Sequence, residues 1–104
     1  MHTIRVSGDL GFRRVNETRQ VLLKYLTESD GLVVDMSDVY RIDSAGLAGL
    51  VEVLQAARLS GRSFRLARVR DGVMRVIRFA RLDKVFFDAE KDGLMPSEGY
   101  RAVA

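Results

Sequence analysis

The chain has 104 residues, 47% of them hydrophobic, which is enough for one compact domain with its own core. It contains no cysteine, which excludes disulfide frameworks, thiolate metal sites and cysteine nucleophiles. No apolar run is long enough to cross a membrane and no signal peptide precedes the first strand pattern, so we expect a cytoplasmic protein without membrane insertion.

The formal net charge of +3 is unevenly distributed. Between Arg58 and Arg81 the chain has eight arginines and one acid, Asp71, so this segment carries +7 and the remainder −4. Such a segment is either a solvated face or a docking surface for an acidic partner or an anionic headgroup. Nucleic acid is not an expected partner, because no helix-turn-helix, RNP or zinc pattern accompanies the arginines.

The first third of the chain predicts a strand followed by a helix. Residues 3–7 alternate between apolar and polar side chains, which is typical of a strand. Residues 8–11 contain two glycines and predict a loop. Apolar residues recur at helical spacing over residues 14–29, and Gly31 then stands near the position where a helix cap favours glycine.

The middle of the chain predicts a buried strand and a second helix. Residues 32–36 are apolar except for Asp35, a pattern that favours a central parallel strand covered on both faces. Ser37 and Asp38 predict a turn, after which residues 39–42 lead back to the core. An amphipathic helix is expected from about Ala45 to Ser60.

The last third predicts a strand over residues 63–69, a helix from Asp71 and a short strand over residues 85–87. Strands and helices therefore alternate along residues 1–88, which predicts an α/β domain with a mostly parallel or mixed sheet of about four strands and right-handed crossovers. Residues 89–104 are expected to form a polar C-terminal tail.

The junction Arg41-Ile42-Asp43-Ser44-Ala45-Gly46-Leu47 connects the buried strand to the second helix. Ser44 should lie at or just before the first helical turn, where backbone N–H groups and a partial positive charge favour an anion. A serine at this position is either a helix cap or a place for a phosphate. Small residues, Gly46 and Gly49 among them, follow along the helix and indicate either tight packing on the sheet or contact with a partner.

No catalytic residue, cofactor or metal site is predicted. The one histidine, His2, stands near the start of the chain, and no phosphate-cradling glycine loop is present. A carboxylate cluster of Asp35, Asp38 and Asp43 at the strand ends could hold Mg²⁺ as in receiver domains, but the lysine expected after a later strand is replaced by Arg70. We favour turn formation for Asp38 and orientation of the Ser44 loop for Asp43.

The segment Leu32-Val33-Val34-Asp35-Met36-Ser37, then Val39 and Ile42-Asp43-Ser44-Ala45-Gly46-Leu47, resembles the STAS domain of bacterial anti-sigma factor antagonists. Residues 6–10, 61–66 and 73–86 support the resemblance, which covers roughly residues 3 to 87.

The resemblance implies a non-enzymatic protein that regulates transcription by partner switching. Ser44 would be phosphorylated by a kinase that is also the anti-sigma factor, and a serine phosphatase would reverse the modification. Asp35 and Asp38 would support the phosphorylation site. The resemblance places partner binding on the residues Asp43, Ser44, Ala45, Gly46, Leu47 and Gly49.

Two departures from the antagonist pattern leave an alternative open. The N-terminal strand that usually comes first in the family is not evident, so the sheet is expected to lack an edge strand. Gly11 and Phe12 occupy the place where many antagonists have an acid, and this pattern also resembles the STAS subunit of Mla-type phospholipid ABC transporters. There the domain binds and supports an ATPase subunit. The sequence does not identify the partner or the oligomeric state.

Overall fold

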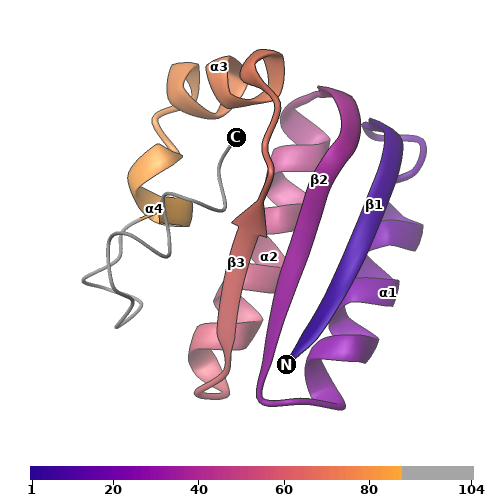
Figure 1. Ribbon diagram of the computed structural model, residues 1–104, viewed down its shortest axis with the longest axis vertical. Helices are drawn as coiled ribbons and strands as arrows, with labels where there is room; N and C mark the ends of the chain where they lie inside the picture. Colours follow the sequence, from indigo (N-terminus) through magenta and orange to yellow (C-terminus); the bar gives the residue numbers. More distant parts are fainter. Residues whose placement is uncertain (88–104) are drawn as a thin grey trace.

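The computed structural model describes residues 1–87. Strands and helices alternate over most of this length, which confirms the α/β class (Figure 1). In chain order the elements are β1 (His2–Leu10), α1 (Val15–Thr27), β2 (Gly31–Ile42), α2 (Ser44–Leu59), β3 (Ser63–Ala67), α3 (Asp71–Phe79) and α4 (Asp83–Phe87).

The three strands form one parallel sheet in the order β1-β2-β3, so β2 is the central strand, as predicted. The expected cover on both faces of β2 is wrong for residues 1–87, because α1 and α2 lie on the same face of the sheet (Figure 1). Figure 1 shows α1 and α2 together behind the sheet, α3 near the carboxyl ends of the strands, and α4 beside β3. Because β1 and β2 are parallel, the loops that follow them both lie at the carboxyl end of the sheet.

The predicted turn at Ser37 and Asp38 is wrong: β2 continues through it to Ile42. Its register against β1 shifts between Arg5 and Ser7, and Ser7 lies opposite Asp38. An extra residue in β2 therefore forms a bulge, which keeps the strand paired while it twists. The two polar residues have partners within the sheet, because the Ser37 N–H donates to Asp35 Oδ1 at 2.9 Å and Arg5 contacts the Asp38 carboxylate.

The expected strand over residues 85–87 is also wrong, and residues 1–87 contain three strands where about four were expected. These residues form α4, in which the backbone N–H of Phe86 donates to the carbonyl of Leu82 at 3.0 Å. The Phe86 ring packs near Phe64 of β3, with ring centroids 6.5 Å apart. Aromatic residues favour strands, but here tertiary packing determines the local structure. The predicted tail lies outside the described residues.

The core lies between the sheet and the two helices that cover one of its faces. Leu22 and Leu26 of α1 and Leu50 and Leu54 of α2 are at most 2% exposed, and they pack with the buried residues of β2. These four leucines are among the residues that the 3.6-residue periodicity predicts to face inward.

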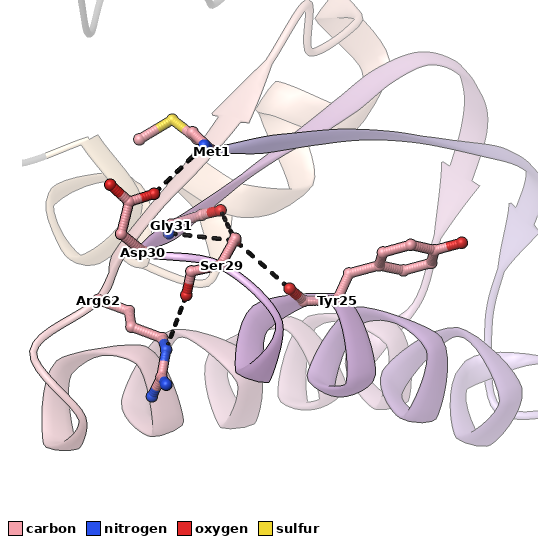
Figure 2. Close-up of polar contacts among 6 residues, drawn as sticks. All are labelled: Met1, Tyr25, Ser29, Asp30, Gly31 and Arg62. Carbon is pink, nitrogen blue, oxygen red and sulfur yellow. Dashed lines mark hydrogen bonds and ion pairs between the residues drawn. The ribbon is translucent and has the colours of Figure 1, made fainter.

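Polar contacts connect the two turns at the amino end of the sheet (Figure 2). The Ser29 hydroxyl donates to the carbonyl of Gly31 at 2.6 Å, and Arg62 Nε donates to the carbonyl of Ser29 at 2.9 Å. The amino group of Met1 lies 3.2 Å from the Asp30 carboxylate. Arg62, one of the eight arginines in the basic segment, therefore has a structural contact that joins the turn before β2 to the turn before β3.

Candidate functional site at the carboxyl end of the sheet

Asp43 caps the N-terminus of α2. Its backbone is extended (φ −112°, ψ −176°), and its Oδ1 accepts a hydrogen bond of 2.9 Å from the backbone N–H of Gly46. The backbone N–H of Leu47 donates to the Asp43 carbonyl at 3.0 Å. The interpretation of Ser44 as the helix cap is therefore wrong. Ser44 is the first residue of the helix, as the junction predicted, and it is exposed.

The second carboxylate oxygen of Asp43 binds the loop between β1 and α1. The backbone N–H of Phe12 donates to Asp43 Oδ2 at 3.1 Å, and the Asp43 N–H donates to the carbonyl of Leu10 at 3.3 Å. Hydrogen bonds from the N–H of Gly46 and then of Phe12 favour the charged form, so the pKa of Asp43 lies below its usual value although partial desolvation acts against this. Asp43 thus holds the start of α2, where Ser44 lies, and the loop between β1 and α1.

The glycines of α2 serve packing inside the domain. A Cβ on Gly46 would collide with the backbone carbonyl of Leu10, and one on Gly49 would collide with the side chain of Val15. Gly46 and Gly49 are buried, and Leu47 is 5% exposed. These three residues of the predicted partner-binding set are therefore packed inside the domain, whereas Asp43 and Ser44 are exposed and Ala45 is half-buried. Partner binding by the six residues stays a prediction.

The structure does not bring Asp35 and Asp38 to Ser44. Arg5 of β1 contacts both carboxylates, with Nε 3.5 Å from Asp35 Oδ2 and a terminal nitrogen 3.7 Å from Asp38 Oδ2. Asp38 precedes Asp43, the neighbour of Ser44, by five positions along β2. At about 3.3 Å per strand residue, the two backbones are roughly 16 Å apart. Within residues 1–87 no three acidic or histidine side chains are grouped to hold a metal, so the receiver-type Mg²⁺ site is not assembled there.

The basic segment does not form one arginine face. Arg62 lies at the amino end of the sheet, whereas Arg70 follows β3 at the carboxyl end and donates to the carbonyl of Ser37 at 2.9 Å. Arg58 donates to the carbonyl of Val85 at 3.2 Å. Several of these arginines therefore hold loops together rather than standing free in solvent.

Two exposed aromatic residues, in the loop after β1 and near the end of β2, were not among the predicted site residues. Phe12 is 69% exposed in the loop that Asp43 binds, and Tyr40 near the end of β2 is 62% exposed. The guanidinium of Arg70 lies 4.1 Å from the centre of the Tyr40 ring. The sequence signal that could have identified them is an aromatic residue next to an arginine beside a strand end, as in Phe12-Arg13 and Tyr40-Arg41.

Comparisons with known proteins agree with this architecture. The family model described as "Mlab, STAS domain" matches residues 2–94. Among residues 1–87, no helix is sufficiently long and apolar to span a bilayer.

Two solved structures share the fold. The unphosphorylated form of the anti-sigma factor antagonist SpoIIAA superposes with a TM-score of 0.66 at 17% identity, covering 77% of this chain and 71% of that one. A sulfate transporter family protein from Wolinella succinogenes superposes with a TM-score of 0.72 at 17% identity, covering 85% of this chain and 72% of that one. Because the family model covers most of the chain and the fold agrees with it, the chain belongs to the STAS domain family.

Proposed function

We propose that this protein is a non-enzymatic partner-switching regulator of the anti-sigma factor antagonist type, controlled by reversible phosphorylation of Ser44. Its partner would be an anti-sigma factor that is also a serine kinase, and a serine phosphatase would restore the binding form, with the whole switch in the cytoplasm. Support comes from STAS family membership, since these domains typically bind and regulate partners, and from the structural likeness to an anti-sigma factor antagonist.

One observation carries the proposal: Ser44 is exposed at the first position of α2 while Asp43 provides the cap. A kinase could modify the Ser44 hydroxyl without removing the hydrogen bond that starts the helix. The helix N-terminus favours the added charge of about −1.5 to −2. In a closed interface, however, the same charge beside Asp43 would be desolvated and would weaken partner binding.

The first experiment compares the intact mass of the protein purified from its own cells with that of Ser44→Ala. A phosphate-sized increment in part of the wild-type population, absent from the variant, supports the proposal. Absence of the increment under every growth condition rejects it.

The second experiment measures partner binding by calorimetry. Ser44→Ala should bind the kinase and stay bound in the presence of ATP, whereas Ser44→Asp should bind weakly. Gln55→Glu is the matched control, because it adds the same single charge to the exposed face of α2, eleven positions from Ser44. Equal affinities for all four proteins would rule out a switch at Ser44.

A second candidate function is a STAS subunit that binds and supports the ATPase of an Mla-type phospholipid ABC transporter. The specific observation in its favour is the family model, whose description names Mlab. This function predicts stable co-purification with an ATPase subunit in both the wild type and Ser44→Asp. Transporter genes beside this gene, rather than kinase and phosphatase genes, would favour it.

A further inference from the structure

The end of the sheet next to Ser44 has a hollow of about 520 Å³ between the β1–α1 loop and the end of β2. Its lining combines apolar surface with charge. The residues that define its character are Asp9, Phe12, Arg13, Arg14, Arg41 and Asp43.

The side chains around the hollow give it an excess of positive charge. Of its two acids, Asp43 already accepts hydrogen bonds through both carboxylate oxygens, from Phe12 and Gly46. Three arginines, Arg13, Arg14 and Arg41, line the hollow against these two aspartates, so its formal charge is +1, and Arg13 and Arg41 are exposed. A negatively charged group therefore complements this surface.

The apolar part of the hollow is held in place before any partner arrives. Phe12 exposes 69% of its surface, yet its backbone is bound to Asp43, and the Arg13 guanidinium lies 5.9 Å from its ring centre. Because the backbone of Phe12 is already ordered, binding a partner through this large side chain costs less conformational entropy than binding through a flexible loop.

From the net positive charge and the exposed ring on an ordered loop, we propose that this hollow binds an acidic segment of the partner protein. A carboxylate of that segment contacts Arg13 and Arg41, and a neighbouring apolar side chain packs on Phe12. The inference rests on the proposed function, because it requires a protein partner that binds at the Ser44 end of the sheet. It adds that this partner has an acidic residue next to an apolar one.

The test is an NMR titration of the ¹⁵N-labelled full chain with a short soluble peptide of glutamates around one central leucine. Backbone amide signals of Phe12, Arg13 and Arg41 should shift, whereas those of Arg75 and Arg78 in α3 should not. The same peptide with lysine in place of glutamate should leave all five signals unchanged. Shifts centred on α3, or no shifts at all, would overturn the proposal.

Charge-reversal variants show which arginines bind the acidic peptide. Arg13→Glu/Arg41→Glu should weaken peptide binding at least about tenfold. Arg75→Glu/Arg78→Glu makes the same change in net charge on exposed positions of α3 and should leave the affinity unchanged. An equal loss in both double variants would mean non-specific attraction and would contradict a site at the hollow.

Two further measurements distinguish an acidic protein segment from an anionic membrane, and the hollow from the switch at Ser44. The first is binding of the wild type to vesicles of anionic phospholipid. If the vesicles bind through Arg13 and Arg41 and the acidic peptide does not bind, the hollow is a membrane-binding surface and the proposal is rejected. The peptide titration does not depend on Ser44 modification. If the peptide binds at the hollow while Ser44→Asp keeps full partner affinity, the phosphorylation switch fails and the acidic-partner site stands.

Discussion

The carboxylate of Asp43 accepts a hydrogen bond of 3.1 Å from the backbone N–H of Phe12, which lies 31 positions earlier in the chain. Its other oxygen caps α2 through Gly46. One side chain therefore positions both the residue proposed for phosphorylation and the loop that carries the exposed ring. The two parts of the site are joined through a single carboxylate.

Replacing Asp43 should separate the two roles of its carboxylate. Asp43→Ala removes both acceptors and should lower the melting temperature, with faster amide hydrogen exchange at Phe12 and Gly46. Asp43→Asn keeps one amide oxygen that can cap α2 but lacks a second acceptor for Phe12. It should therefore restore protection at Gly46 and leave Phe12 fast, as measured by NMR. Equal exchange at both amides in the two variants would contradict this division.

Alanine at Gly46 should destabilise the domain more than alanine at Gly49. The added methyl at Gly46 meets the backbone carbonyl of Leu10, which cannot move without disturbing β1. At Gly49 it meets the side chain of Val15, near the start of α1, where a small adjustment relieves the contact. Overpacking of this kind costs about 1–3 kcal/mol, partly offset by the better helix propensity of alanine. Urea unfolding measures both values, and the reverse order would contradict the packing described for α2.

The free energy of unfolding should fall on acidification below about pH 4. Burial raises the pKa of Asp35, but hydrogen bonding from Ser37 and the charge of Arg5 lower it by more, and the pKa of Asp43 is also lowered. A carboxyl with a depressed pKa in the folded state contributes stability above its unfolded pKa and loses it as pH falls through the folded value. Urea titrations at a series of pH values should therefore show a shallower acid dependence in Asp43→Asn. An unchanged slope would contradict this contribution.

Helix α4 should be part of the cooperative domain. Phe86→Ala removes a ring that is 3% exposed and should cost about 3 kcal/mol or more. Phe79→Ala is the matched control, because Phe79 is 93% exposed and its loss should change stability by no more than about 0.5 kcal/mol. Thermal or urea unfolding distinguishes the two variants. Similar small effects would show that α4 does not contribute to the fold.

The sequence predicted the three strands and the helices between them in their order along the chain, because these elements have recognisable apolar patterns. It failed where contacts distant in sequence decide the structure. The bulge that keeps Ser37 and Asp38 in β2 depends on pairing with β1, and the helical state of residues 85–87 depends on packing against Phe64. Local propensity favoured a turn and a strand at these two places.

The candidate site was predicted in position but not in detail. The strand-to-helix junction placed Ser44 correctly at the start of α2. Aspartate and serine are about equally good caps, so adjacent Asp43 and Ser44 could not be assigned from the sequence alone. The hydrogen bond from Phe12 to Asp43 joins two loops far apart in sequence, and no local pattern encodes it.

The polar contacts of Ser29 and Arg62 tie the two amino-end turns together, whereas Phe12, Arg13 and Arg41 stand exposed at the opposite end of the sheet. Substitutions at these exposed residues leave the core and the amino-end contacts intact. Evolution can therefore change the choice of partner at one end of this small domain with little loss of the ability to fold.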